Sequence, residues 1–386
     1  MHGPDTEPRV LHVDEQEGWR GGEQQMLYLA RGLKQRGYRT AAVVRPDAAG
    51  VERLAEAGIS THQMRMKGEA DLGAARRIAR LARRGEYNIL HSHTAHAQML
   101  AQLASRLFWA GAKVVAHRRI EFPVGRGLFG LGRLKYRFGV DAYVAISNRV
   151  KQTLLEAGVP EWRVFVVRSV TDPARFTDVD PAPDLRESLG IPEDAFLVGN
   201  IAALVGHKDH RTLLEAARRV RDEIPETWLV IVGDGPLRDQ ILDKANSLHM
   251  SERLVMTGYR RDVPELIGLF DVFALSSSEE GLCSTLLEVA AGGCPIVATD
   301  AGGVREAVLP VKTGIVVPTR SPRALAEGVL QLARHPEQAQ QMAQRGRRRV
   351  EEQFNPEALT SQTLEVYRRV LRGEVCPEEP VGFRPA

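Results

Sequence analysis

The segment from Val272 to Thr299 constrains the fold of this chain more than any other stretch. It contains a short apolar strand (Val272 to Ser276), then a glycine-containing turn and a helix, then a second strand that begins at Pro295. Strand, helix and strand in succession are typical of a parallel sheet with helices on its faces. The helix N-terminus directs unpaired N–H groups, and the positive end of its dipole, at the sheet edge where open α/β folds bind ligands.

Two carboxylates, Glu280 and Glu288, flank the start of this helix. An anion would bind the N–H groups between them. The carboxylates would accept hydrogen bonds from hydroxyl groups, one at the helix start and one about two turns further along. A phosphate flanked by two polyols is a nucleotide sugar, so the segment predicts a nucleotide-sugar site. Taken alone, Glu288 could equally be a solvated charge on a helix surface.

Strands and helices alternate through almost the whole chain, which predicts an α/β protein with two Rossmann-like parallel-sheet domains. One series of strands runs from Arg9 to Ser169 and a second from Phe196 to Pro318, with a linker rich in Pro and Asp between them. The strand ends of the two halves are expected to face each other across a cleft. The expected parts are an N-terminal acceptor-binding domain (1–172), a C-terminal nucleotide-sugar-binding domain (173–354), a C-terminal helix that packs back on the first domain (355–372) and a tail (373–386).

The composition excludes several classes of protein. Hydrophobic residues make up 43% and charged residues 26% of the 386 residues, which is ordinary for a folded globular protein. The three cysteines have no spacing typical of a disulfide framework or a zinc site, which favours a reducing compartment. The chain shows neither a signal-peptide pattern nor an apolar run long enough to span a membrane. We therefore expect a cytoplasmic protein.

The charge is distributed unevenly between the two halves. Residues 1–172 contain 27 Lys and Arg against 17 Asp and Glu, whereas the remainder contains 25 against 32. A basic first half suggests an acidic partner, and nucleic acid, anionic lipid and acidic glycan all satisfy this pattern. The basic helical stretch from Ala75 to Arg84 is either a solvated face or a surface that contacts membrane head groups or an anionic acceptor.

Glu280 and Glu288 lie in EGLCSTLLEVAAGGCPIVATDAGGVREAV, which resembles the signature of the retaining family 4 glycosyltransferases, a two-domain GT-B family. The resemblance implies that Glu280 contacts sugar hydroxyls, that Glu288 contacts the ribose of the nucleotide, and that nearby backbone N–H groups meet the sugar and diphosphate. The donor contacts implied in this segment are Glu280, Gly281, Leu282, Cys283, Ser284 and Glu288.

Lys208 is the expected cation at the departing diphosphate, where the chemistry needs positive charge. The family pattern is Gly-Arg-Leu followed by Lys after three residues, whereas this chain has Ala203 in place of the arginine. One phosphate clamp is therefore absent, and His207, His210 or Arg211 are candidates to compensate. A lone lysine of this kind can also be a solvated surface residue.

The first half contributes a glycine-rich loop and a histidine. Gly21 and Gly22, followed by Glu23, come after the first strand and resemble the family loop that lies over the donor and borders the acceptor site. His93 matches a family histidine at a strand end, near the C6 side of the sugar and the reacting centre. His91, His93 and His96 could form a metal site instead, but no acidic fourth ligand lies nearby in the sequence.

Further segments complete the resemblance. Tyr259 and Arg260 lie in GYRRDVPELI, which resembles the loop whose backbone reads the base, and are candidate base contacts. Arg118 and Arg119 are candidate acceptor contacts, together with the stretch from Gly127 to Phe138, which is rich in basic and aromatic residues. Val167-Arg168-Ser169-Val170 departs from the family's usual Pro-Asn-Gly at the hinge.

The resemblance implies retaining transfer of a sugar from a UDP- or GDP-sugar to a hydroxyl of a glycan, lipid-linked or lipopolysaccharide-type acceptor, with His93, Lys208 and Glu280 as the catalytic residues. We expect no divalent metal and no other cofactor, because no Asp-x-Asp stands at a strand end. Front-face attack would need no protein base, and double displacement through a carboxylate nucleophile stays open. The expected partners are the nucleotide sugar, the acceptor and the inner face of an anionic membrane, with no nucleic acid.

Two other functions fit parts of the sequence. A non-catalytic nucleotide-sugar binder is suggested by Ala203. A dinucleotide-dependent oxidoreductase is suggested by the glycine-rich turns after strands, but no G-x-G-x-x-G follows the first strand and no acidic residue stands at the end of the second.

Overall fold

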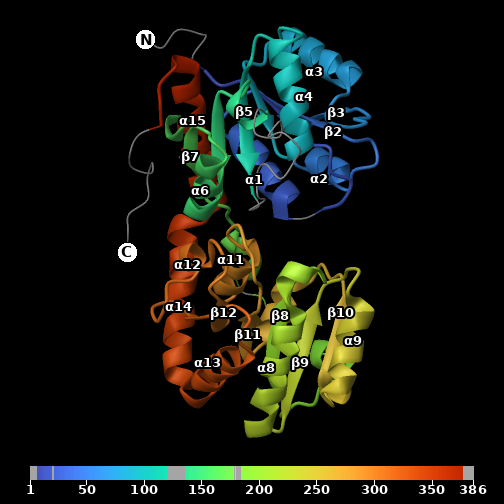
Figure 1. Ribbon diagram of the computed structural model, residues 1–386, viewed down its shortest axis with the longest axis vertical. Helices are drawn as coiled ribbons and strands as arrows, with labels where there is room; N and C mark the ends of the chain where they lie inside the picture. Colours follow the sequence, from blue (N-terminus) through green and yellow to red (C-terminus); the bar gives the residue numbers. More distant parts are fainter. Residues whose placement is uncertain (1–6, 20, 120–134, 178, 180–183, 377–386) are drawn as a thin grey trace. The chain divides into compact units, whose positions relative to one another are not determined.

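The computed structural model (Figure 1) describes residues 7–19, 21–119, 135–177, 179 and 184–376. The chain divides into two compact units. Unit 1 comprises residues 1–169 and 356–386, and unit 2 comprises residues 170–355. Along the chain, unit 2 is therefore inserted between two parts of unit 1.

In unit 1 the described residues form a seven-stranded parallel sheet in the order β3-β2-β1-β4-β5-β6-β7. Strands β1, β4 and β6 are buried along their whole length, and β5 is buried except at Lys113, as expected for a sheet covered on both faces. The strands are β1 (Val10–Val13), β2 (Thr40–Val44), β3 (Ser60–Gln63), β4 (Ile89–Ser92), β5 (Lys113–Arg118), β6 (Ala142–Ala145) and β7 (Val164–Val166).

Helices connect these strands, and three of those described begin at a side-chain cap. Asp71, Thr94 and Ser147 each accept a hydrogen bond from a backbone N–H in the first turn of the helix that follows. The last helix of the chain, α15, packs against α1 (Figure 1). The helices of unit 1 are α1 (Gly21–Gln35), α2 (Gly50–Glu56), α3 (Leu72–Arg84), α4 (Ala95–Arg106), α6 (Asn148–Glu156), the 3-10 turn η3 (Glu161–Arg163) and α15 (Pro356–Arg372).

Unit 2 contains a six-stranded parallel sheet in the order β10-β9-β8-β11-β12-β13. The strands are β8 (Phe196–Ile201), β9 (Thr227–Val232), β10 (Leu254–Gly258), β11 (Val272–Leu275), β12 (Ile296–Thr299) and β13 (Ile315–Val317). The helices and turns are η4 (Pro173–Phe176), α7 (Leu185–Ser188), η5 (Gly206–Lys208), α8 (His210–Glu223), α9 (Arg238–Ser247), η6 (Ser251–Arg253), α10 (Val263–Leu269), α11 (Ser284–Ala291), α12 (Val304–Ala307), α13 (Pro322–Arg334) and α14 (Pro336–Gln353).

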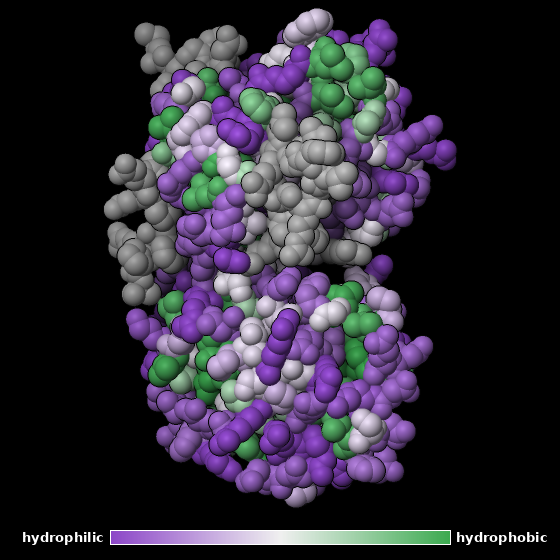
Figure 2. All heavy atoms as spheres, in the orientation of Figure 1, coloured by the Kyte–Doolittle hydropathy of each residue, from purple (hydrophilic) through white to green (hydrophobic). Residues whose placement is uncertain are grey.

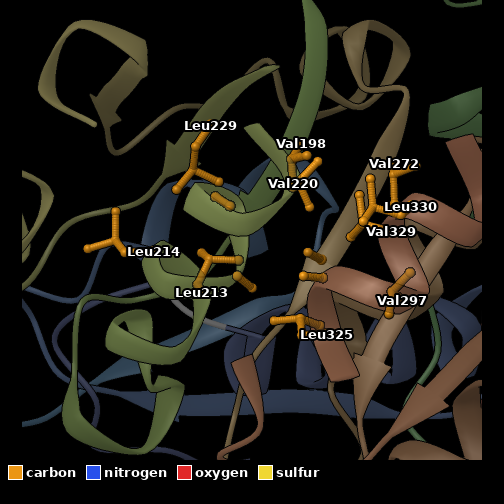
Figure 3. Close-up of a cluster of buried hydrophobic side chains, with 14 of the residues drawn as sticks. Val198, Leu213, Leu214, Val220, Leu229, Val272, Val297, Leu325, Val329 and Leu330 are labelled. Carbon is orange, nitrogen blue, oxygen red and sulfur yellow. The ribbon is translucent and has the colours of Figure 1, made fainter. Parts of the chain in front are cut away.

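The core of unit 2 lies where α8 and α13 pack together and onto the sheet (Figure 3). Leu213 from α8, Val272 from β11 and Leu325 from α13 meet in this cluster and are almost fully buried. Removing each such side chain from water contributes about 1.5–3 kcal/mol to folding. On the face of unit 2 in view in Figure 2 the surface is mostly hydrophilic, with scattered hydrophobic residues.

Both sheets reverse their strand order at one place. In unit 1, β1 pairs with β2 on one side and with β4 on the other, and in unit 2, β8 pairs with β9 and β11 in the same way. Such a switch point leaves a crevice at the carboxyl ends of its two central strands, which is where open α/β sheets bind ligands. The fold thus marks one place in each unit for a site.

The predicted α/β class with two Rossmann-like parallel-sheet domains is confirmed. One local prediction was wrong: Gly21 and Gly22, expected in a loop after the first strand, form the first turn of α1. The strand β3 was missed because its residues are polar and only partly buried, so it lacks an apolar pattern. Of the helices that the structure describes, none combines the length and the apolar character that a bilayer crossing demands.

Candidate active site

Lys208 and Glu280 meet at the switch point of unit 2. Lys208 ends η5, which follows β8, and Glu280 follows β11, the strand paired with β8. The Lys208 Nζ donates a hydrogen bond to Glu280 Oε1 at 2.5 Å, and the Ser277 hydroxyl donates to the same oxygen at 2.7 Å. Two residues that are far apart in the sequence thus form one charged pair at the sheet edge.

Hydrogen bonds fix the two loops that carry this pair. The Ser276 hydroxyl donates to the Lys208 carbonyl at 2.8 Å, and the backbone N–H of Ser278 donates to the His207 carbonyl at 2.8 Å. The backbone N–H of Gly303 donates to the Glu280 carbonyl at 3.1 Å. The position of the pair is therefore set by the backbone and not by two flexible side chains alone.

The pair is largely withdrawn from water, with side-chain exposures of 17% for Lys208 and 8% for Glu280. Burial alone would lower the pKa of Lys208, but the neighbouring Cys283 and Glu280 side chains reverse the shift and raise it. Lys208 is therefore protonated at neutral pH. Burial, and then the charge of Glu280, raises the pKa of the Cys283 thiol to about 12, so the thiol is neutral.

The N-terminus of α11 lies beside this pair. Cys283 occupies the cap position with a φ of 67° and makes no side-chain capping bond to the first turn. Leu282 is fully buried, so its side chain packs in the interior beside this helix start. A negatively charged group bound here would meet the N–H groups of the first turn and the ammonium of Lys208.

Glu288 lies further along α11 and is partly exposed. Its Oε1 lies 3.7 Å from the Arg175 Nη1, and Arg175 comes from the turn η4 at the start of unit 2. Burial raises the pKa of Glu288, and the positive charge of Arg175 opposes that rise. Sequence reasoning missed Arg175, because nothing in its local sequence marks a partner more than a hundred residues away.

The loop that carries Ala203, the residue at the position of the family arginine, is tightly packed. Gly233 and Gly235 both have positive φ values, and a Cβ at Gly233 would lie 2.0 Å from the Ala202 carbonyl oxygen. The backbone N–H of Leu204 donates to the Asp234 carbonyl at 3.0 Å. The turn after β9 therefore packs directly on the loop that carries Ala203, and this close approach requires glycine at positions 233 and 235.

Two of the candidates to replace the missing arginine are constrained. Burial, and then the charge of Lys208, lowers the pKa of His210 to about 4, so His210 is neutral at neutral pH. Neither of its ring nitrogens has a partner among the described residues. Arg211 is exposed and pairs with Glu215 on its own helix at 3.1 Å. His207, the third candidate, is exposed.

The two predicted base contacts differ in their surroundings. Tyr259 follows β10 directly and its side chain is 62% exposed. The Arg260 guanidinium is held by Asp262 through its Nε at 2.8 Å and through its Nη2. The Arg260 side chain is therefore engaged within its own loop, whereas Tyr259 offers its ring to solvent.

In unit 1 the predicted His93 and Arg119 lie together. Arg119 Nη1 donates to the His93 carbonyl at 3.0 Å, and Arg119 Nη2 lies 2.9 Å from His93 Nδ1. A Cβ at Gly22 would come within 3.1 Å of Arg119 Nη1, so the glycine gives the guanidinium its room. The glycine pair, the arginine and the histidine thus form one assembly at the end of β4.

The hydrogen bonds determine the tautomer of His93. An arginine can only donate, so His93 Nδ1 accepts and the ring's single proton lies on Nε2. Nε2 lies 2.9 Å from Nδ1 of His12, which must accept in turn. Burial, and then nearby charges that include Arg119, lowers the pKa of both histidines, so both rings are neutral.

His12 belongs to a buried histidine cluster, which consists of His12, His91, His93 and His117. His91 stacks on His93 with ring centroids 4.4 Å apart and on His117 with centroids 5.5 Å apart. The Tyr367 hydroxyl, on α15, lies 2.5 Å from His91 Nδ1. Sequence reasoning missed His12 and His117. His12 lies opposite His91 in the register of β1 and β4, whereas His117 lies on β5.

The histidine cluster contains three residues close enough to be considered as metal ligands. One ring nitrogen each from His12, His91 and His93 lie within 4.8 Å of one another, whereas the predicted third ligand, His96, is exposed beside Glu15 and Glu69. The described structure thus groups His12, and not His96, with His91 and His93, which differs from the trio considered as an alternative from the sequence. The His93 Nε2 that would bind a metal carries the proton that Arg119 imposes, and the guanidinium repels a cation, so these residues do not fit a metal well.

The remaining predicted residues of unit 1 are mostly internal. Glu23 is 7% exposed, and Arg118 is 7% exposed with its guanidinium 5.1 Å from the centre of the Tyr136 ring. Asp14, close to Glu23, has its pKa raised to about 7 by burial and then by the charge of Glu23. Of the stretch from Gly127 to Phe138, residues 127–134 lie outside the described residues, as do residues 377–386 of the tail.

Sequence comparison identifies two family matches. Residues 182–349 match the family described as glycosyl transferases group 1, and residues 19–175 match glycosyltransferase family 4. The chain is 29% identical over 310 residues to N-acetyl-alpha-D-glucosaminyl L-malate synthase of Bacillus anthracis, covering 79% of this chain and 80% of that protein. It is 26% identical over 354 residues to the lipopolysaccharide core biosynthesis glycosyltransferase LpsE of Rhizobium meliloti, covering 90% and 95%.

Solved structures show the same fold. HepE of Anabaena in complex with UDP-glucose superposes with a TM-score of 0.80 at 20% identity, covering 93% of this chain and 98% of HepE. A glycosyltransferase from Rickettsia africae gives a TM-score of 0.83 at 21% identity, covering 95% of this chain and all of the other.

Proposed function

This chain is a glycosyltransferase of the family 4 type with the GT-B fold, and from that premise we propose that it moves a sugar from a UDP- or GDP-sugar to a hydroxyl group of an anionic glycan or lipid-linked acceptor. The observation that carries the proposal is the buried pair of Lys208 and Glu280 beside the N-terminus of α11. This arrangement supplies a fixed cation, backbone N–H donors and a carboxylate within one small region. A sugar attached to a diphosphate needs all three.

The proposed chemistry is retention at the anomeric carbon. The bond between the anomeric carbon and the diphosphate oxygen breaks, and the acceptor hydroxyl attacks from the same face while the departing oxygen takes its proton. Lys208 and the N–H groups of α11 stabilise the charge that develops on the leaving diphosphate. Glu280, held by Lys208 and Ser277, orients the sugar hydroxyls.

We propose that this reaction needs no divalent metal. The support is chemical: Lys208 is protonated, and the uncapped N–H groups of α11 add a second source of positive charge at the same place. Turnover should therefore persist in excess chelator. Loss of activity with EDTA, and its recovery with Mg²⁺ or Mn²⁺, would contradict this part of the proposal.

The anionic acceptor is proposed from the charge of unit 1. Residues 1–172 carry ten more basic than acidic side chains. On α3, Ala75, Ile78 and Ala82 are buried, so the arginines of this helix point outward. One relative is named as the synthase of a glucosaminyl derivative of L-malate, which is a dicarboxylate, and another is named for lipopolysaccharide core biosynthesis.

Peripheral contact with the inner face of a membrane follows the same charge. Sedimentation with vesicles that contain anionic lipid tests it, with neutral vesicles and high salt as controls. Binding to acidic glycans in the same salt series distinguishes a charged acceptor from a charged membrane. Salt-independent behaviour with both would overturn the role of charge.

The decisive experiment is a donor screen by thermal shift with UDP- and GDP-sugars. A true donor raises the melting temperature by mass action. At 100 times its dissociation constant it adds about 2.7 kcal/mol to the free energy of unfolding. Slow donor hydrolysis, lost in Glu280→Ala, would support catalysis. Because Ala203 replaces a phosphate-binding arginine, a non-catalytic binder is the second candidate, and it predicts stabilisation without turnover on any acceptor.

A further inference from the structure

Glu288 has one described ionic partner, and that partner lies in the chain segment that opens unit 2. Arg175 belongs to η4, a few residues after Val170, the first residue of the unit. The Arg175 Nη1 lies 3.7 Å from the Glu288 Oε1. Neither the sequence motif nor the expected chemistry assigns Arg175 a role.

The local structure holds Arg175 in place. The Asp172 side chain caps η4 by accepting from the backbone N–H of Ala174 at 3.2 Å. Phe176 is 5% exposed, and the Arg175 guanidinium lies 5.3 Å from the centre of its ring. Just before the turn, the backbone N–H of Thr171 donates to the Phe354 carbonyl at 2.9 Å. The arginine is therefore presented by an anchored turn that packs against α11.

The contact is too long for a hydrogen bond and is partly open to solvent, with side-chain exposures of 38% for Arg175 and 23% for Glu288. Such an ion pair contributes little to stability. The described residues give the Glu288 carboxylate no hydrogen bond, so its oxygens keep their accepting capacity. The geometry suits a carboxylate that is held ionised and oriented while it waits for a hydroxyl donor.

From this geometry we infer that Arg175 is a positioning residue for the donor ribose, which keeps the Glu288 carboxylate charged and directed so that it accepts hydrogen bonds from the ribose hydroxyls. The inference rests on the proposed function, because it requires that Glu288 bind the ribose. It adds that ribose recognition depends on the turn that opens unit 2, and not on α11 alone.

The inference has a measurable signature in the ribose itself. A site built to hydrogen-bond a hydroxyl discriminates strongly against an analogue that lacks it, because the buried acceptor is left without its partner. The wild-type protein should therefore bind UDP or GDP more tightly than the matching 2′-deoxyribonucleotide. Without Arg175, the Glu288 carboxylate is less well oriented and loses the positive charge beside it, so this preference should shrink.

The experiment measures dissociation constants of UDP, GDP and their 2′-deoxy forms by calorimetry for the full chain. The variants are Arg175→Ala, Arg175→Lys and Glu288→Gln, with Arg323→Ala as the matched control, since Arg323 is an exposed arginine of unit 2 that pairs with Glu327 on its own helix. Arg175→Ala should weaken ribonucleotide binding about tenfold and leave deoxyribonucleotide binding within about twofold. Arg175→Lys should restore part of the loss, and the control should match the wild type.

Each other outcome has a defined meaning. If the wild type distinguishes ribose from deoxyribose, Glu288→Gln abolishes the distinction and Arg175→Ala leaves it intact, the inference is wrong while the proposed function stands. Equal weakening of both nucleotides by Arg175→Ala would likewise refute ribose positioning, because a direct phosphate contact or local unfolding does not depend on the 2′-hydroxyl. Failure of the wild type to bind any nucleoside diphosphate would overturn the proposed function itself.

Discussion

The two units place their functional groups at the same point of the same kind of sheet but treat charge in opposite ways. In unit 2, the switch point between β8 and β11 holds the ionised pair Lys208 and Glu280. In unit 1, the switch point between β1 and β4 holds the histidine cluster, whose members have lowered pKa values through burial. A topology therefore fixes where a site forms, whereas the residues placed there decide whether it binds a polyanion or a neutral hydroxyl.

The largest effect is expected from removal of the Lys208 charge in unit 2. Lys208→Met should lower kcat by about 10²–10³-fold, because a preorganised cation at the leaving group is lost and Glu280 is left without its partner. Steady-state kinetics with the identified donor and acceptor would measure it. Glu280→Gln keeps the shape and provides the comparison, and near wild-type turnover in both variants would refute the proposed site.

Acid should destabilise unit 1 more than unit 2. A histidine whose folded pKa lies below its unfolded value of 6.5 contributes stability above that value and loses it as pH falls toward the folded pKa, which is about 3 for His12. Unit 1 should thus lose about 2 kcal/mol between pH 6.5 and pH 5 from His12 alone. The other three members act in the same direction. Unit 2 has one comparable residue, His210, among those described, with a pKa of about 4.

Asp14 acts in the opposite direction and offers an internal check. Its folded pKa of about 7 exceeds its ordinary value of 3.8, so its contribution is complete below 3.8 and is lost as pH rises through 7. Asp14→Asn should therefore make the acid loss of unit 1 steeper. Hydrogen exchange of peptides from β1 and β4 against β8 and β11, at pH 7 and pH 5, would measure both effects. Equal loss of protection in the two units would contradict the assignment.

A third test changes unit 1 without touching nucleotide binding. Arg119→Lys cannot reproduce the two N–H groups that hold the His93 carbonyl and Nδ1, so the tautomer of His93 is no longer imposed. We expect kcat to fall about tenfold while the dissociation constant of UDP or GDP stays unchanged, because the proposed nucleotide site lies in unit 2. A matching loss of nucleotide affinity would show that the two sites are not separable in this way.

The smallest expected effect concerns the base. Tyr259 is 62% exposed, so Tyr259→Ala should weaken UDP or GDP binding by about fivefold or less, through lost ring contact with the base. Calorimetric titration of the variant measures this directly. A loss beyond about a hundredfold would show that the side chain, and not the backbone of its loop, reads the base.

The part of the site that could be predicted from the sequence consists of short local motifs. Glu280, Glu288, Lys208 and the glycine pair each stand next to a strand end in a short recognisable segment, so their type and order predicted a donor site. The fold class followed from the alternation of strands and helices for the same reason. These inferences needed no knowledge of which strands become neighbours.

The parts that could not be predicted from the sequence depend on which strands and helices become neighbours. His12 meets His91 only because β1 and β4 pair in the register that places these residues opposite each other. Arg175 meets Glu288 through the packing of η4 on α11. The helix start at Gly21 was missed because two glycines favour a turn in isolation, and tertiary packing overrides that preference.

The contact between the Tyr367 hydroxyl and His91 affects the order in which the two units can be completed. Tyr367 lies on α15, whereas His91 lies on β4, so unit 1 acquires this contact only after residues 170–355 have been synthesised. Unit 2, residues 170–355, leaves the ribosome complete while unit 1 still lacks its closing helix. The usual order, in which the N-terminal domain matures first, is therefore reversed. A chain truncated before α15 would therefore contain all of unit 2 but only part of unit 1.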